Sequence, residues 1–375
     1  MSILLLIFGL LMFVGLVVIH EYGHYLAARK SGVVVEEFGI GFPPRAWARK
    51  LKSGMLFTLN WLPLGGFVKL KGENDSATEK GSYGSVPLKN KVLIMTAGVV
   101  MNLLTAFVLF TFLALVGMPK LIENQFTIPS DTKVVRNQVL VGYVSEGSPA
   151  EKSGLLQRDQ IISVTSGDKS YQLTSADQLP GITKELAGEE ISVTVVRDGQ
   201  TQVIETQLRG EQEVKESLVT NEPKGYLGVS PSEYTIQRST WSAPIVAAGV
   251  IKQFTTETLK GLGSAIGNLI KGNGGAASSQ VSGPVGIFVI LKDGSLLGYQ
   301  FILMIIAIIS LTLAIMNILP IPALDGGRLF VTLIYHKILR RPLSKETEER
   351  IHGTGFAVLM LLFILITFVD VRRFF

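Results

Sequence analysis

Two histidines with a glutamate beside the first are the residues of this sequence best suited to chemistry. They lie in the run His20-Glu21-Tyr22-Gly23-His24. On a helix, the H-E-x-x-H spacing places both imidazoles on one face, one turn apart, where they can bind a zinc ion. The glutamate is then placed to act as a general base toward a water at the metal. The pattern therefore predicts a hydrolytic zinc site.

The residues that precede this motif are almost all apolar. Positions 3–19 consist nearly entirely of Leu, Ile, Val, Phe and Gly. Ionisable side chains inside a membrane segment are costly and mark functional sites. The alternative is two histidines satisfied by hydrogen bonds within a helix bundle, but the sequence contains only four histidines, so that a chance H-E-x-x-H is rare. A zinc hydrolase site at membrane depth implies a substrate that also lies in the membrane.

The composition is that of a membrane protein. The 375 residues are 47% hydrophobic and 17% charged, and the mean hydropathy of +0.39 is too high for an ordinary soluble protein. A net charge of +5, spread without a basic stripe interleaved with aromatic residues, gives no support to nucleic-acid binding. Cysteine is absent, which excludes disulfides and any cysteine-ligated zinc.

Four apolar stretches predict transmembrane helices, at about residues 3–28, 92–118, 299–319 and 356–369. The long, mostly polar segment 120–298 must then hold a soluble domain.

The short loops predict the orientation of these helices. Loop 29–91 carries eleven Lys or Arg and loop 325–354 carries six, so both should be cytoplasmic. The chain would then start outside, and segment 120–298 would face outward. Arg372 and Arg373 would also lie outside, against the rule, and we follow the two inner loops because they agree.

A catalytic zinc site uses three protein ligands and leaves one position for water. Asp325 is the candidate third ligand, because it follows a broken helix end. Pro320 and Pro322 free backbone carbonyls, which is tolerated at membrane depth only around a cavity or site. The first and third predicted helices both run inward, so the ends carrying His24 and Asp325 meet on one side. The alternative is a simple helix stop with Asp325 in solvent.

H-E-Y-G-H at 20–24 and N-I-L-P-I-P-A-L-D-G at 317–326 together resemble the site-2 protease family of intramembrane zinc metalloproteases. The likeness is strongest to the bacterial branch typified by the regulator-of-sigma-E protease. It covers nearly the whole chain, including an expected turn at 38–42 and the segments 64–68 and 97–102. Within the last of these, Val99 replaces a proline that is common in the family.

The resemblance implies roles for individual residues. His20, His24 and Asp325 would be the zinc ligands, and Glu21 the catalytic carboxylate. Other residues would contact the substrate, and this expected set is Asn317, Pro320, Pro322, Asn102, Leu64, Gly65 and Gly66.

Residues 55–70 suit the binding of an unwound substrate. They read as two short strands broken by Pro-Leu-Gly-Gly, which predicts a hairpin or re-entrant sheet. An exposed edge could pair with an extended substrate by strand addition. The alternative is a cytoplasmic hairpin that only covers the bundle. The polar, Gly- and Ser-rich residues 72–85 predict a mobile cytoplasmic loop.

Residues 141–155 and 159–164 resemble a bacterial PDZ domain. Ser148 and Pro149 would open a helix, and Gly154 would close it. PDZ domains bind extended peptides at a sheet edge. We place the pocket for the peptide end in the loop before residues 140–144, with residues 226–229 as the rival. The domain would gate bulky substrates or recognise a cut end, and the alternative is an inert spacer.

The remaining segments carry weaker signals. Residues 240–272 predict an amphipathic helix, or a pair of helices, on the outer membrane surface, and 272–279 predict a hinge. Residues 282–287 resemble a family motif. His336 and His352 are expected to be solvated surface residues.

We therefore predict a polytopic α-helical membrane protein with four transmembrane helices, a membrane-associated β-hairpin and an inserted extracytoplasmic PDZ (α+β) domain. The predicted parts are an N-terminal membrane part at 1–118, the PDZ domain at 119–235, an amphipathic surface segment at 236–298 and a C-terminal membrane part at 299–375.

The expected function is zinc-dependent hydrolysis of peptide bonds within transmembrane segments of single-pass proteins, such as anti-sigma factors or remnant signal peptides. The expected partners are these substrates, a peptide or substrate outer domain at the PDZ domain, and the bilayer of the inner (plasma) membrane, without nucleic acid. The alternatives are a silent PDZ scaffold, which would not need Glu21, and a zinc transporter, which would carry more internal repeats.

Overall fold

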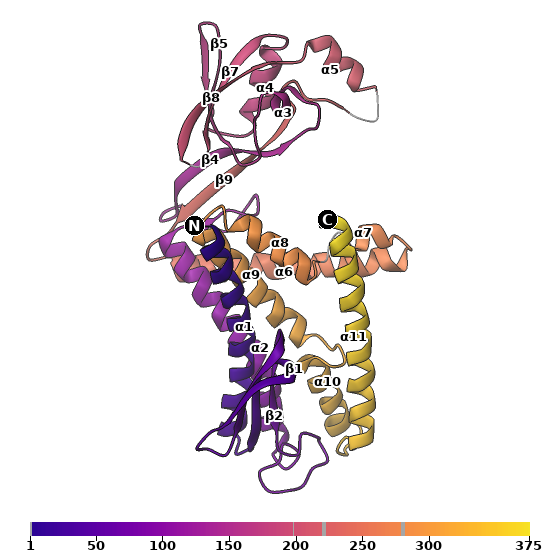
Figure 1. Ribbon diagram of the computed structural model, residues 1–375. Helices are drawn as coiled ribbons and strands as arrows, with labels where there is room; N and C mark the ends of the chain where they lie inside the picture. Colours follow the sequence, from indigo (N-terminus) through magenta and orange to yellow (C-terminus); the bar gives the residue numbers. More distant parts are fainter. Residues whose placement is uncertain (1, 198, 220–222, 279–281) are drawn as a thin grey trace. The chain divides into compact units, whose positions relative to one another are not determined.

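The computed structural model describes residues 2–197, 199–219, 223–278 and 282–375 (Figure 1). The chain forms two compact units. Unit 1 comprises Met1–Val116, Gln125–Ile128 and Thr240–Phe375, and unit 2 comprises Gly117–Asn124 and Pro129–Ser239.

Four helices of unit 1 are long and apolar enough to cross a membrane, which confirms the predicted number for the described residues. The first three lie close to the predicted ranges, but the fourth begins at Lys345 instead of near Phe356. Its start is fixed by Ser344, whose side chain accepts a hydrogen bond from the Thr347 N–H. The helices are α1 (Ser2–Lys30), α2 (Leu88–Val116), α9 (Tyr299–Ile318) and α11 (Lys345–Phe374).

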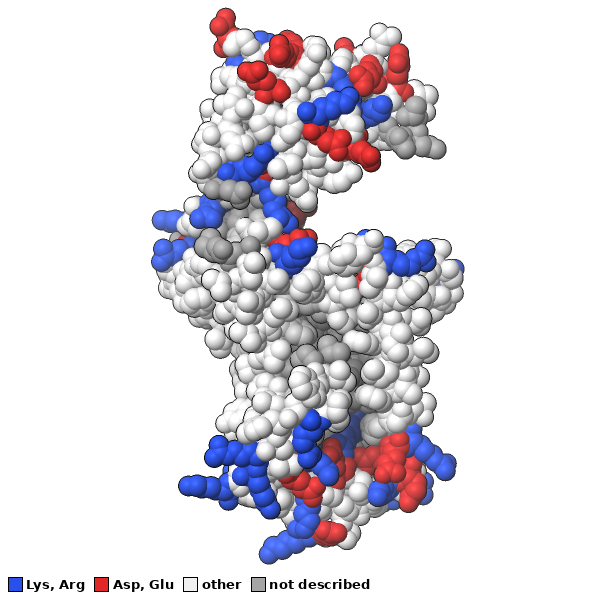
Figure 2. Space-filling view, viewed as in Figure 1, with Lys and Arg blue, Asp and Glu red and all other residues white. Residues whose placement is uncertain are grey.

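A broad band of uncharged side chains covers the middle of unit 1 on the face shown in Figure 2. Most of its lysines, arginines and acidic residues on this face gather at the end formed by the first sheet and the start of α11, and fewer lie at the opposite end of the band. This pattern is the one that a bilayer requires, since charged side chains are costly within its hydrocarbon core.

Glycine allows α1 and α2 to approach closely. A Cβ at Gly23 would lie 2.6 Å from the Ala97 carbonyl oxygen and 2.7 Å from Met101 Cγ. Small residues at such a crossing let two membrane helices pack backbone to backbone. Helix α2 also packs against α9 and against α6 (Ala243–Ile270). The face of α1 that carries the histidines is thus held against the centre of the bundle.

The first sheet differs from the predicted hairpin. Strand β2 (Leu56–Leu70) does not fold back on itself. Its two halves lie on either side of the first part of β1 (Val35–Lys50), and residues 45–50 of β1 pair with 56–60 of β2. Residues 35–40 pair with 56–59 along one edge and with 66–70 along the other. The run 38–42, expected as a turn, is part of β1, with Gly41 at φ +80°. Because these pairings join distant residues, local turn signals could not reveal them.

Shorter helices complete unit 1. The predicted amphipathic segment is one helix, α6, and the predicted hinge contains α7 (Gly274–Ser278), while residue 279 lies outside the described residues. The motif at 282–287 begins α8 (Pro284–Gly294), whose Gly283 and Gly286 N–H groups donate to Asp370 of α11. After α9 come α10 (Asp325–Leu333) and the π-helix η1 (Ile334–Ile338).

Unit 2 is built on one antiparallel sheet of order β3-β9-β4-β5-β7-β8, with β6 paired to β5. Its core lies between the sheet and helix α4, where Val141, Ile161, Leu179 and Val193 are buried together. The elements are β3 (Met118–Pro119), β4 (Lys133–Val144), α3 (Pro149–Lys152), β5 (Gln160–Ser166), β6 (Lys169–Gln172), α4 (Gln178–Glu185), β7 (Glu190–Arg197), β8 (Gln200–Gln207), α5 (Glu211–Ser217) and β9 (Val229–Arg238).

Candidate metal centre

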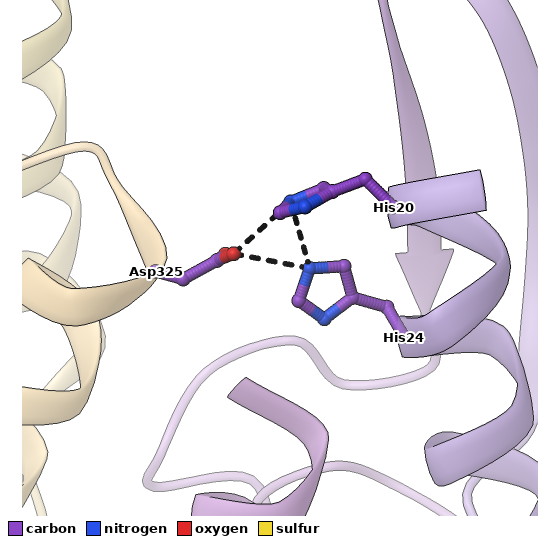
Figure 3. Close-up of side chains that lie close together, drawn as sticks. All are labelled: His20, His24 and Asp325. Carbon is purple, nitrogen blue, oxygen red and sulfur yellow. Dashed lines mark hydrogen bonds and ion pairs between the residues drawn. The ribbon is translucent and has the colours of Figure 1, made fainter. Parts of the chain in front are cut away.

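Side chains from two distant parts of the sequence meet at one point of unit 1. His20 and His24 project from one face of α1, and Asp325 comes from the start of α10 (Figure 3). The two Nε2 atoms lie 3.3 Å apart, and Asp325 Oδ2 lies 3.1 Å from each of them. These residues form the one group of three or more metal-binding side chains found among the described residues.

The hydrogen bonds behind the rings determine which nitrogens face this point. His24 Nδ1 donates to the Ile94 carbonyl oxygen at 2.7 Å, so its Nε2 carries a lone pair. His20 Nδ1 contacts the Asn102 side-chain amide at 3.2 Å. If the Asn102 amide is turned so that Oδ1 faces the ring, the His20 Nδ1–H can donate a hydrogen bond to it. Asn102 Oδ1, otherwise buried without a partner among the described residues, then has one. Both Nε2 atoms are then acceptors.

Two ring lone pairs and a carboxylate oxygen at this spacing fit a cation. Zinc bound tetrahedrally, with bonds of about 2.0–2.2 Å, sets its ligand atoms about 3.3 Å apart. The observed separations of 3.1–3.3 Å match that geometry.

The loop that ends α9 sets the position of Asp325. Ala323 adopts φ +73°, a conformation that non-glycine residues rarely take. The next two residues of α10 after Asp325 have no room for a side chain. A Cβ at Gly326 would lie 2.3 Å from Ile318 C, and one at Gly327 would lie 2.0 Å from the Ile321 carbonyl oxygen. The two glycines thus let α10 begin directly against the chain that leads into it.

Glu21 lines the same cavity as the three metal-binding side chains. The cavity has a volume of about 580 Å³, and its wall includes Gly66, Phe67 and Val68 of β2. A Cβ at Gly66 would lie 3.0 Å from Glu21 Cγ, so the strand backbone passes directly beside the carboxylate. Glu21, the three candidate metal ligands and strand β2 therefore share one space.

This centre is what a metal-dependent peptidase requires, and comparisons with known proteins agree. The sequence matches peptidase family M50 over residues 8–362. The chain belongs to this family, the site-2 proteases. It is 30% identical to a putative zinc metalloprotease of Campylobacter jejuni, over 96% of this chain and 90% of that protein. It is 26% identical to the zinc metalloprotease RasP of Shouchella clausii, over 96% and 97%. It is also 24% identical to the probable protease eep of Enterococcus faecalis, over 99% and 98%.

The chain is therefore a zinc metalloprotease of the M50 family, and the apolar helices fit a multi-pass protein of the inner membrane.

The structure separates the residues expected to contact substrate in this M50 protease. Gly66 lines the cavity of the metal centre. Asn102 is fully buried behind His20, where its amide contacts the ring. Pro322 lies against α11, because a Cβ at Gly355 would be 2.5 Å from the proline Cβ. The others are Gly65, beside the Phe42 ring; half-buried Asn317, near the end of α9; exposed Pro320, in the following loop; and Leu64, within β2, whose side chain is outside the described part.

Sequence analysis did not find the charged cluster beside this centre. Arg328 donates to Glu73 Oε1 at 3.0 Å and to Glu348 Oε1 at 3.1 Å, and its guanidinium lies 4.9 Å from the centre of the Tyr83 ring. Burial by itself lowers the pKa of Arg328, but Tyr83 and the two carboxylates outweigh it and raise the pKa above its usual value. No spacing pattern links residues so far apart in the chain.

The expectation for the other two histidines is wrong. His336 Nε2 lies 2.9 Å from Asp75, which also accepts hydrogen bonds from Lys91 Nζ at 2.6 Å and the Leu343 N–H at 2.7 Å. Burial by itself raises the pKa of Asp75, but these hydrogen bonds outweigh it and lower the pKa. His352 Nδ1 accepts from the Ala323 N–H at 3.4 Å. Both histidines therefore join packed contacts and are only partly exposed to solvent.

Proposed function

We propose that this zinc metalloprotease hydrolyses peptide bonds within the transmembrane segments of single-pass membrane proteins. One observation carries the proposal: His20, Glu21 and His24 lie on a helix apolar enough to cross a membrane, with Asp325 facing them. A catalytic centre at that depth is reached most directly by a peptide bond that is itself in the bilayer. Anti-sigma factors and remnant signal peptides are substrates of this class.

His20, His24 and Asp325 would hold the zinc ion in this mechanism, with Asn102 orienting the His20 ring. When bound, zinc lowers the pKa of a water molecule and polarises the scissile carbonyl. Glu21 removes a proton from the attacking water and later delivers it to the leaving amine nitrogen. Glu21 is half-buried and lines the cavity that the three candidate ligands share, so its carboxylate lies on the side from which a substrate would enter the site.

Strand residues 66–70 would hold the substrate in an extended form. They pair with residues 35–40 on one side, and no described strand pairs with their other edge. Since a helix must unwind before its peptide bonds can be cut, its freed N–H and C=O groups need new partners in the membrane. Strand addition at this edge supplies them beside Glu21. Gly66 and the other predicted substrate contacts of this segment, Leu64 and Gly65, belong to this proposal.

Unit 2 would act as an extracytoplasmic PDZ domain that gates substrates or binds a peptide end. The strand β9 pairs with β4 along its length, and only Gln237 and Ile236 near its end pair with β3. The rest of the β9 edge that faces away from β4 pairs with no other described strand. This free part of the edge begins at Val229, at the end of the Tyr226–Val229 loop. This arrangement favours that loop, the rival position, as the pocket for a peptide end.

Replacement of Glu21 by Gln tests the proposed activity. The variant keeps the shape of the side chain and all three metal ligands but cannot accept a proton. We expect zinc binding to persist, while cleavage of a single-pass helix in detergent or vesicles falls by a factor of about 10² or more. The matched change Glu346→Gln, at an exposed position of α11, should leave cleavage unchanged. Wild-type protein that binds zinc but cuts no helix, even one without its outer domain, would favour the scaffold alternative.

A further inference from the structure

Helix α11 contacts the segment that carries Asp325 at three successive positions. Residues 348, 352 and 355 recur at the spacing of one helical face, so they present a continuous surface to residues 322–328. The contacts are Glu348 with Arg328, His352 with Ala323, and Gly355 with Pro322. Figure 1 shows α10 beside the lower part of α11. The loop between the end of α9 and the start of α10 is therefore held in place by α11, in addition to the hydrogen bonds within the loop.

The first of these contacts is an ion pair between buried Glu348 and half-buried Arg328. Glu348 is only 5% exposed, and its Oε1 accepts from Arg328 at 3.1 Å. Its Oε2 accepts from the Asp75 N–H at 2.9 Å. Arg328 lies one turn after Asp325 on α10 and also donates to the Glu73 side chain and carbonyl oxygen. The guanidinium is thus fixed on several sides, and it fixes the first turn of α10.

We infer that Arg328 and Glu348 are positioning residues that hold Asp325 at the distance from His20 and His24 that zinc binding requires. The inference rests on the proposed role of Asp325 as the third zinc ligand. Neither residue touches the metal point: they act through α10, whose first turn carries the ligand and whose second carries the arginine.

Geometry gives the reason why this pair matters more than an ordinary ion pair. The histidines are on one helix and hold each other at 3.3 Å, but Asp325 reaches them from a separate element. A small rotation of α10 would move its carboxylate away from both Nε2 atoms. Groups that orient a metal ligand from behind typically change metal affinity by about 10- to 100-fold when removed.

The direct test is Glu348→Gln in the full-length protein in detergent. We expect the zinc dissociation constant, measured by competition with a chromogenic chelator, to rise about 10- to 100-fold. The visible spectrum of the Co²⁺-substituted protein should change as well, because it reports the geometry around the metal. The matched control is Glu346→Gln, which removes the same charge from an exposed position of the same helix turn and should alter neither reading.

A double variant separates positioning from a general loss of stability. Glu348→Gln alone leaves the half-buried Arg328 charge with one partner fewer, which lowers the melting temperature. Arg328→Met combined with Glu348→Gln removes both charges, and Glu73 is 41% exposed, so that water can solvate it. We expect the melting temperature to recover in part and the zinc affinity to stay low. Zinc affinity that recovers together with the melting temperature would overturn the inference.

Asp325→Asn distinguishes this inference from the proposed function beneath it. If Asp325→Asn binds zinc as tightly as the wild type, the assignment of the third ligand fails, and the positioning role fails with it. If Asp325→Asn loses zinc while Glu348→Gln and the double variant bind it with wild-type affinity, only the positioning role is overturned. Loss of affinity in all three, with Glu346→Gln unchanged, supports both.

Discussion

The surroundings of Asn102 favour a role in orienting the His20 ring over a role in contacting substrate. Its side chain is fully buried and touches His20 Nδ1, on the side of the ring opposite the metal point. An amide there supplies an acceptor that fixes the tautomer and the orientation of the ring. A substrate contact requires access to the cavity, and Asn102 does not line the cavity wall described above.

Replacing Asn102 tests this orienting role. Asn102→Leu removes the acceptor for His20 Nδ1–H at nearly constant volume, and we expect zinc to bind about 10-fold more weakly or worse. Asn102→Asp keeps an oxygen at the same place and should bind zinc close to the wild-type level. Equilibrium zinc competition on the three proteins gives the comparison. Equal affinity in Asn102→Leu and wild type would contradict the role, and a rise only in the Michaelis constant for substrate would return Asn102 to the substrate-binding set.

The sequence predicted individual site residues where chemistry and spacing are local. The H-E-x-x-H spacing and the helix-breaking prolines before Asp325 named three side chains that the structure brings within 3.3 Å of one another. Arg328 and Glu348 escaped notice because a single arginine in a basic loop resembles a solvated charge. Their pairing depends on how α11 packs, which no short pattern encodes.

At the level of elements, the crossing of α1 and α2 brings a glycine against the metal centre. Gly98 of α2 faces both histidines: a Cβ there would lie 2.5 Å from His24 Nε2 and 2.7 Å from His20 Nε2. These are the two atoms proposed to bind zinc. The absence of a side chain at this position therefore leaves room for the ligand atoms themselves, in addition to letting the helices approach.

We expect Gly98→Ala to abolish most zinc binding and to lower cleavage by about 10²-fold, since a displacement of about 1 Å at an active site has that cost. Gly15→Ala is the matched control, because Gly15 lies on α1 with no neighbouring atom within 4 Å of an added Cβ. Zinc content of the purified proteins and cleavage of a single-pass helix would be measured together. Wild-type zinc content in Gly98→Ala would show that the helices can separate without disturbing the histidines.

Helices and strands were unequally predictable for a physical reason. Long apolar runs identify membrane helices by themselves, because the bilayer sets their length. Strand β1 contains Gly39, Gly41 and a Pro-Pro pair, which locally resemble a turn, and it is stabilised by β2 on both of its sides. The start of α11 was missed because its first turns are polar, and a hydropathy argument begins only where the apolar residues do.

At the level of the whole molecule, the orientation in the membrane decides what the protease can cut and where the products go. The two loops rich in Lys and Arg predict a cytoplasmic location for the first sheet and for η1, and the polar unit 2 would then lie outside. Arg372 and Arg373 count against this orientation, so that the distribution of charge alone does not decide it. The resemblance to a PDZ domain is equally compatible with either side.

The absence of cysteine from the sequence allows a direct test of orientation, because each introduced cysteine is the only thiol in the protein. Ser53, Gln207 and Lys337 are exposed in the first sheet, unit 2 and η1. With a membrane-impermeant maleimide on intact spheroplasts, we expect Gln207→Cys to be labelled, and Ser53→Cys and Lys337→Cys to be labelled only after detergent is added. The reverse pattern would place unit 2 in the cytoplasm. A gate for substrate outer domains would then be ruled out, while the chemistry at His20, Glu21, His24 and Asp325 would stand unchanged.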